Sequence, residues 1–532
     1  MNRYIQYMYS YPHKTAYRAL ENVNLRDYFF NLEGEGHSLY LHLPFCESKC
    51  GYCNLFSVTG CGRSRMDAYI DAVLRQVRQY QEMMPRSTSF DDLTIGGGTP
   101  LLLESGQIER IFETVKANLP MSGSCKIIIE TAPNQTDQEK VELLKKLGVT
   151  RVSMGIQSFD NGELRWLGRN HDSRRAGEAA GLLRDAGFEC VNFDFIYGLP
   201  GQTAESLTRS LEMALSFSPD EIFLYPLYIK HGVRLEREGR KGLLDPEHMY
   251  ALYRCGSEYL RENGYMQISM RRFIKRGFGE TTLADGLRKN VLPGNLDREN
   301  VLQGKECRGD ILQEGIFPEF SECGLKSALS LGCGGRSYLG RLHACTPYRT
   351  TRNTALEEIE RYQRTEDFSS VSNGILLSDE ELKRRYVIKH LLILPGISRQ
   401  AYKRAFQADV LEDFPIIKDW IGQGWLEERC GNAGCDALDR DGRAHGNGNG
   451  DALDRAGRAH GNGNDDALYR AGRAHGNGNG DALDCDGKDH GVNDHNYIGL
   501  TTEGLGLSDY IGPQLISEDI MGRMLEWERA NA

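Results

Sequence analysis

Residues 41–56 read LHLPFCESKCGYCNLF, a short apolar run followed at once by three cysteines. Cys46, Cys50 and Cys53 follow a C-x3-C-x2-C spacing, and no fourth cysteine or histidine lies at the offset that a closed structural zinc site needs. A [4Fe–4S] cluster needs a ligand on each of its four irons, so three thiolates leave one iron open. The spacing therefore predicts an open iron–sulfur centre, with Cys61 as the alternative fourth ligand.

The apolar run before the cysteines is the first of six that alternate with amphipathic segments. The apolar runs, which predict β-strands, are 38–45, 92–98, 126–132, 151–157, 191–198 and 221–229. The amphipathic segments, which predict helices, are 69–80, 104–118, 137–147, 174–187 and 203–216. This alternation predicts an α/β fold with a parallel sheet, either open or curled into a partial (β/α)6 barrel. In such folds the active site lies at the carboxyl ends of the strands, where the cysteines fall.

Further unusual residues fall at the same ends of the predicted strands. The segment GGGTP at 96–100 closes the second strand, and its glycines would let the backbone approach a ligand closely. The alternative is that GGGTP forms an ordinary turn at the end of the strand and binds no ligand. Glu130, Gln157 and Asp194 are polar residues on apolar strands, where an unpaired polar group is costly. Together they predict a polar pocket over the mouth of the barrel.

The composition favours a globular protein of a reducing compartment. The chain has 532 residues, 40% of them hydrophobic, and a net charge of -11, which argues against a nucleic-acid surface. No apolar run is long enough for a membrane span, and none near the first residues has the form of a secretory signal. We therefore expect a cytoplasmic monomer. The 14 cysteines then raise the question of metal chemistry. Four of them could hold a second cluster, although we favour the interpretation that they are ordinary reduced thiols. These four are Cys307, Cys323, Cys333 and Cys345.

Shifts in composition divide the chain into five expected parts. These are an N-terminal arm at 1–37, the core at 38–275, an irregular insertion at 276–325, the end of the core with a connecting helix at 326–378, and a winged-helix-like α+β cap at 379–532. The cap should not bind DNA, because residues 397–429 contain five Lys or Arg against six Asp or Glu.

A repeat of fifteen residues, first seen as DALDRDGRAHGNGNG, occupies 436–495 within the expected cap. Its Asn-Gly tracts cannot bury enough apolar surface to order themselves, so we expect a flexible insertion. Binding of divalent metal by its Asp and His residues, or stacking into a small solenoid, are the alternatives.

The cysteine spacing, with Tyr52 before the last cysteine, resembles the signature of radical S-adenosylmethionine (SAM) enzymes. The motifs LHLPFC, GGGTP, RVSMGIQSF and FDFIYGLPGQT narrow the resemblance to oxygen-independent coproporphyrinogen III oxidase and its relatives, over residues 40 to about 228. The resemblance implies a partial (β/α)6 barrel with a C-terminal cap, a [4Fe–4S] cluster, one or two molecules of SAM, and an electron donor such as flavodoxin or ferredoxin. It also implies that cleavage of SAM gives a 5′-deoxyadenosyl radical that abstracts hydrogen from a small, porphyrinogen-like substrate.

The resemblance also implies roles for individual residues. Cys46, Cys50 and Cys53 would hold the cluster. The SAM contacts that it implies are Tyr40 and Tyr52 at the adenosine, Gly97, Gly98 and Thr99 at the methionine end, Glu130 at the ribose, and Gln157, Arg169 and Asp194 around one or two SAM molecules. An arginine such as Arg169 suits a carboxylate.

Three activities remain open within this family: oxidative decarboxylation, radical methylation, and haem delivery by a chaperone that retains the cluster but turns over little. Decarboxylating oxidases have a further cysteine directly after the triplet, where this chain has Asn54 and Leu55. The Tyr-Trp motif of the family, and the His-Asn motif that precedes it in the haem chaperones, are absent from the corresponding segment LGCGGRSYLG at 331–340.

Overall fold

We describe the fold from a computed structural model of the chain. The structure describes residues 3–8, 10–278, 327–349, 351–430 and 496–531. The chain divides into two units, of which the first comprises Met1–Glu428 and Tyr497–Ala532 and the second Arg429–Asn496. Nearly all of the second unit, with the predicted repeats at 436–495, lies outside the described residues, as does most of the predicted insertion.

Six parallel strands form the centre of the main sheet and confirm the predicted α/β fold. They are β2 (His37–Leu43), β5 (Phe90–Gly97), β6 (Met121–Thr131), β7 (Arg151–Gln157), β8 (Cys190–Tyr197) and β9 (Glu221–Pro226). The strands lie side by side in chain order, as expected when each helical crossover returns the chain to the next position in the sheet. Their carboxyl ends therefore meet along one edge, which brings together residues from distant parts of the sequence.

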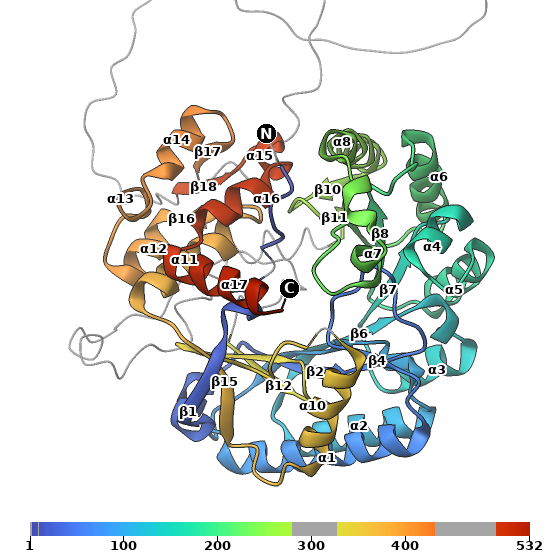
Figure 1. Cartoon of the computed structure of the whole chain (residues 1–532), viewed down its shortest axis with the longest axis vertical. Coiled ribbons are helices and arrows are strands. Elements are labelled where there is room, and N and C mark those ends of the chain that lie inside the picture. Colours follow the sequence, from blue (N-terminus) through green and yellow to red (C-terminus); the bar gives the residue numbers. More distant parts are fainter. Residues whose placement is uncertain (1–2, 9, 279–326, 350, 431–495, 532) are drawn as a thin grey trace, which may run out of the picture. The chain divides into compact units, whose positions relative to one another are not determined.

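Helices connect these strands and cover the outer side of the sheet (Figure 1). They are α1 (Arg63–Met83), α2 (Ser105–Asn118), α3 (Gln138–Lys146), α4 (Asn161–Leu167), α5 (Ser173–Ala186), α6 (Ala204–Leu215) and α8 (Pro246–Glu262). Five of them match the predicted segments, whereas α4 and α8, the latter after β9, are additions. The apolar face predicted for α1 is buried as expected, with Tyr69, Ile70, Val73 and Val77 all fully buried. Each such side chain contributes roughly 1.5–3 kcal/mol, so this face fixes α1 against the sheet.

Further strands extend the sheet at both edges. Next to β2, in spatial order, are β12 (Ala328–Leu331), β13 (Arg336–Leu339), β14 (Leu342–Cys345), β15 (Ser370–Leu376) and β1 (Arg18–Asn24); beyond β9 are β11 (Arg272–Lys275) and β10 (Tyr265–Gln267). β12 is parallel to β2, whereas β13, β14, β15 and β1 pair antiparallel. Part of the expected N-terminal arm thus belongs to the sheet. Helix α10 (Arg352–Arg364) connects β14 to β15.

The C-terminal part combines short helices with a small sheet, in agreement with a winged-helix-like cap. Its elements are α11 (Asp379–Leu391), β16 (Ile397–Ser398), α12 (Arg399–Phe406), α13 (Val410–Asp413), α14 (Ile416–Gly422), β17 (Leu426–Cys430), β18 (Asn496–Leu500), α15 (Thr502–Leu505), α16 (Ser508–Ile511) and α17 (Glu518–Asn531). The sheet order is β16-β18-β17. A second hydrophobic core, which includes Tyr386, Tyr402, Trp420 and Ile498, holds this part together. No helix within the described residues is long and apolar enough to cross a membrane.

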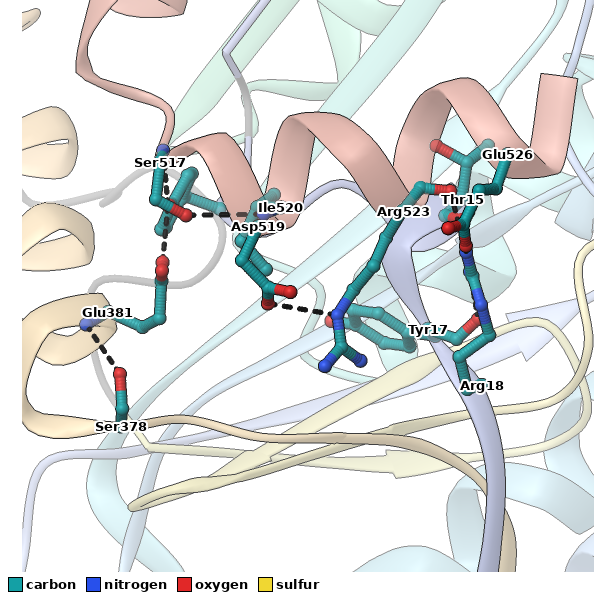
Figure 2. Close-up of polar contacts among 11 residues, drawn as sticks. Thr15, Tyr17, Arg18, Ser378, Glu381, Ser517, Asp519, Ile520, Arg523 and Glu526 are labelled. Atoms are coloured by element: carbon teal, nitrogen blue, oxygen red, sulfur yellow. Dashed lines mark hydrogen bonds and ion pairs between the residues drawn. The ribbon is translucent and has the colours of Figure 1, made fainter.

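The N-terminal arm is held in place by C-terminal residues (Figure 2). The Tyr11 hydroxyl donates to the Glu381 carboxylate of α11 and accepts from the Ser517 backbone N–H at 3.3 Å. The Arg18 guanidinium donates to the Arg523 carbonyl of α17 at 2.7 Å. These contacts fix the short 3-10 helix Lys14–Ala16, which lies between Tyr11 and Arg18.

Candidate functional site

The three cysteines of the opening motif lie on the loop after β2 and line one cavity of about 420 Å³. Cys46 ends the short strand β3 (Phe45–Cys46), which pairs with β4 (Val58–Thr59) and closes the loop. The Cys53 N–H donates to the Cys50 carbonyl at 3.2 Å, in the turn that follows. All three are free, partly buried thiols. Cys61 does not line this cavity.

Two neighbouring segments hold the cysteine turn from outside. The Gly51 N–H donates to the Leu167 carbonyl of α4 at 2.8 Å, and the Leu235 N–H donates to the Gly51 carbonyl at 3.0 Å. A Cβ atom on Gly51 would lie 2.8 Å from side-chain atoms of both Arg234 and Leu235. The turn between Cys50 and Tyr52 therefore packs too closely for any larger residue at position 51.

Polar and charged groups surround the sulfur atoms. The Arg169 guanidinium donates to Cys50 Sγ at 3.1 Å, and the Thr99 hydroxyl lies 3.8 Å from Cys46 Sγ. Burial raises the pKa of Cys46 to about 11, and it also raises the pKa of Cys53. Three thiolates in one cavity would repel one another, so they require a cationic centre.

The glycine segment predicted to approach a ligand also supports the cysteine loop. The Gly98 N–H donates to the Leu43 carbonyl and the Thr99 N–H to the Phe45 carbonyl, both at 2.7 Å. A Cβ atom on Gly98 would lie 2.4 Å from the Phe45 carbonyl oxygen, and Gly97 has a φ of +113°, which disfavours other residues. These glycines line the cavity and also let the backbone approach the loop that carries Cys46.

The polar residues predicted at the strand ends do line the cysteine cavity. Glu130 on β6 accepts from the Gly97 N–H at 3.1 Å, and burial raises the pKa of its carboxyl. Burial also raises the pKa of Asp194, on β8, to about 7, although the Asn192 amide donates to it at 2.8 Å. Gln157 ends β7 with a φ of +74°, a strained conformation for a residue other than glycine. The topology thus brings these residues, far apart in sequence, to one place.

The two tyrosines of the predicted site line different cavities. Tyr52 lines the cysteine cavity, whereas Tyr40 lines a second cavity, also about 420 Å³, which we call the interior cavity. The Tyr40 hydroxyl lies 3.2 Å from His42 Nδ1. The two cavities share six lining residues, which are Tyr7, Leu55, Glu130, Ser153, Asp194 and Tyr225. They therefore meet at Glu130 and Asp194.

Comparison with known proteins identifies the region around this site. Residues 40–214 match the family model of the radical SAM superfamily. We call this part of the chain the radical SAM domain, after the family model that it matches. The matched stretch includes the cysteine loop, the glycine segment and all the strand-end residues named above.

The relatives that this chain resembles include two groups. The haem chaperone HemW of Lactococcus lactis is 31% identical over 246 residues, which cover 46% of this chain and 63% of that protein. The oxygen-independent coproporphyrinogen III oxidase of Escherichia coli is 27% identical over 366 residues, which cover 67% of this chain and 71% of that protein. The match to the haem chaperone thus spans a little under two thirds of its length. These similarities do not decide whether this chain is more closely related to the haem chaperones or to the coproporphyrinogen III oxidases.

A solved structure supports the fold. The coproporphyrinogen III oxidase HemN from Escherichia coli, described as a radical SAM enzyme, superimposes with a TM-score of 0.63 at 22% sequence identity. The superposition covers 79% of this chain and 91% of that one. The similarity extends beyond the radical SAM domain and confirms the predicted fold class.

The donor set of the cysteine cavity fits a [4Fe–4S] cluster with one open iron, the cofactor that the match to the radical SAM superfamily implies. Cys46, Cys50 and Cys53 supply three thiols from one loop, and Arg169 offsets part of the negative charge of their thiolates. No group of three or more His, Cys, Asp or Glu side chains in the described ranges could hold a single metal ion. Of the four cysteines considered for a second cluster, Cys307 and Cys323 lie outside those ranges.

A buried network of charges on β7, β9 and β11 was not anticipated from the sequence. The carboxylate of Glu221, at the start of β9, pairs with Arg151 at 2.6 Å and also with Arg272. All three side chains are buried, and both arginines line the interior cavity. The sequence did contain a signal for this network, because the apolar runs RVSMGIQ and EIFLYPLYI each begin with a charged residue, Arg151 and Glu221.

We expect Glu221→Gln to destabilise the protein by about 3–5 kcal/mol, because it leaves two buried guanidinium groups without their carboxylate. Urea denaturation followed by circular dichroism measures the change. Glu109→Gln is the matched control, since the pair of Glu109 with Lys146 is exposed and should contribute less than about 1 kcal/mol. Equal effects of the two substitutions would contradict a structural role for the buried network.

We expect the protein without cofactors to lose stability as the pH rises from about 4 to about 7, because of Asp194. Its folded-state pKa of about 7 lies above the ordinary value of 3.8, so the folded protein binds more protons than the unfolded chain between these pH values. Asp194→Asn should therefore raise the thermal midpoint more at pH 8 than at pH 5. Asp185→Asn, at an exposed carboxylate, is the control. A gain independent of pH would contradict the assignment to Asp194.

Proposed function

We propose that the chain is a radical SAM enzyme that acts on a small, porphyrinogen-like molecule with carboxylate side chains. The observation that carries this proposal is the junction of two cavities, one lined by the cysteine triplet and the other by the inner face of the sheet. A cofactor in the first cavity would adjoin a substrate in the second at Glu130 and Asp194. The similarity to coproporphyrinogen III oxidases supports the class of substrate.

In this proposal, the cluster and SAM, when bound, supply the radical that removes a hydrogen atom from the substrate. Cys46, Cys50 and Cys53 hold the cluster. Glu130, whose carboxylate already accepts one backbone N–H, orients a hydroxyl-bearing group of SAM. We further infer a cytoplasmic setting and an electron donor such as flavodoxin or ferredoxin.

Gly97, Gly98 and Thr99 are proposed to contact the methionine end of SAM, and Tyr52 its adenosine. Gln157 and Arg169 are proposed to lie near one or two SAM molecules. All six line the cysteine cavity, which supports these roles. Tyr40 is also proposed to contact the adenosine, but it lines the interior cavity, so the lining of the cysteine cavity does not support its role.

The test is anaerobic reconstitution with iron and sulfide, followed by incubation with dithionite, SAM and coproporphyrinogen III. We expect 5′-deoxyadenosine together with a substrate-derived product, both detected by mass spectrometry. A product that has lost CO2 and two hydrogen atoms, once or twice, would identify oxidative decarboxylation. S-adenosylhomocysteine beside a product heavier by a methyl group would identify methylation. Fully reconstituted protein that makes no 5′-deoxyadenosine would refute the proposal.

A haem chaperone is the second candidate, favoured by the 30–31% identity to HemW proteins of Escherichia coli and Lactococcus lactis. Haem titration of the reconstituted protein separates the two candidates. Stoichiometric haem uptake with negligible cleavage of SAM would support the chaperone, whereas turnover of the porphyrinogen would support the enzyme.

A further inference from the structure

A lysine of the N-terminal arm lies in the interior cavity beside the cysteine loop. Lys14 begins the 3-10 helix Lys14–Ala16, and its side chain lines this cavity. Its Nζ atom lies 3.7 Å from the centre of the Tyr348 ring and 3.5 Å from the carbonyl oxygen of Asn54, the residue after Cys53. Lys14 is therefore close to the candidate cluster site, although it is distant from it in sequence.

Two further cations lie near Lys14, which has no carboxylate partner among the residues that the structure describes. The groups that act on its charge are Arg336, Lys49 and the thiols of Cys53 and Cys345. Burial, and next the charge of Arg336, lower the pKa of Lys14 to about 7. A cation placed in this way is unfavourable unless an anion approaches it.

Arg336, at the start of β13, lines the same cavity. Its guanidinium donates to the Ser10 hydroxyl, so the arm and the sheet meet at this point. A guanidinium has five N–H donors in a planar fork and binds a carboxylate in bidentate fashion. Lys14 and Arg336 thus offer two kinds of donor to one region of the cavity.

The attachment of the arm does not depend on Lys14. The arm is held on one side by the contacts of Tyr11 with Glu381 and Ser517, and on the other by the contact of Arg18 with α17 (Figure 2). The Lys14 ammonium makes a long hydrogen bond to the Asn54 carbonyl oxygen and a cation–π contact with the Tyr348 ring, and neither is one of the contacts that hold the arm.

We propose that Lys14 and Arg336 form a subsite for a carboxylate of the substrate in the interior cavity. This inference rests on the proposed function and adds to it the residues that recognise the acidic side chain. By holding one carboxylate next to Asn54, the subsite orients the substrate relative to the cysteine cavity. The N-terminal arm is then part of the substrate-binding site.

The experiment is an anaerobic fluorescence titration of the reconstituted protein with coproporphyrin III, which has four carboxyl groups, and with its tetramethyl ester, which has none. We expect Lys14→Met to weaken binding of the acid by roughly tenfold or more, the usual loss for a charge-assisted hydrogen bond. Binding of the ester should be unchanged, and Lys14→Arg should restore most of the affinity for the acid. Lys146→Met, at an exposed lysine on α3, is the matched control. The thermal midpoint of each variant shows whether it is folded.

Each outcome has a defined meaning. Equal affinity of wild type and Lys14→Met for the acid would overturn the subsite, and so would an equal loss for acid and ester, which indicates packing rather than charge recognition. Wild-type protein that binds neither form would overturn the porphyrinogen-like substrate of the proposed function, and the subsite with it.

Discussion

Replacing Cys50 with alanine should reduce the iron content of the reconstituted protein from about four atoms per chain to nearly none and abolish cleavage of SAM. The cysteine loop offers three sulfur atoms to the cavity, and the loss of one leaves two irons of a cube without a protein ligand. The Arg169 guanidinium would also lose Cys50 Sγ, which accepts its hydrogen bond at 3.1 Å. Iron analysis, the absorbance near 400 nm and the yield of 5′-deoxyadenosine measure the effect.

Cys61→Ala is the matched control, because Cys61 follows β4 and does not line the cysteine cavity. Its iron content and SAM cleavage should equal those of wild type. If Cys61→Ala lost the cluster as Cys50→Ala does, the site would have four protein ligands and no open iron.

Replacing Gly98 with alanine should both destabilise the protein by about 1–3 kcal/mol and reduce cluster loading several-fold. The added Cβ atom would lie 2.4 Å from the Phe45 carbonyl oxygen, a backbone atom that cannot move without moving Cys46. The hydrogen bonds of Gly98 and Thr99 to Leu43 and Phe45 would lengthen at the same time. Thermal unfolding and iron analysis report the two effects separately.

Gly106→Ala tests whether this effect belongs to the cysteine loop. Gly106 lies in α2, and a Cβ atom there meets nothing within 4 Å. Alanine should therefore stabilise this helix by about 0.5–1 kcal/mol and leave cluster loading unchanged. Normal cluster loading in Gly98→Ala would show that the glycine segment does not position Cys46.

The six parallel strands and five connecting helices could be predicted because each has a clear apolar period, and because short apolar runs alternating with amphipathic ones have few packing solutions. The observed ends of the strands differ from the predicted ends by a few residues. The first strand, for example, was predicted at 38–45 and occupies His37–Leu43. The convergence of Glu130, Gln157 and Asp194 followed from strand order alone. Their roles toward SAM stay predictions, as does the division of the chain into five parts.

Other features depend on contacts that no local pattern encodes. The pairing of β1 with β15 joins residues more than 340 positions apart, and the segment around Lys14 carries no motif that indicates a cavity. The network of Arg151, Glu221 and Arg272 is similarly distributed over three strands. The close approach of Gly98 to Phe45 could not be predicted from the sequence, because it depends on where the cysteine loop lies in the fold.

The central claim is that the three cysteines leave one iron of a cluster open for SAM. Electron–nuclear double resonance on the reduced, reconstituted protein, with SAM labelled with ¹⁵N at its amino group and ¹⁷O at its carboxylate, tests it most directly. The account predicts hyperfine couplings from both labels, which show SAM bound to iron. Absence of both couplings in protein that carries a full cluster and SAM would contradict it.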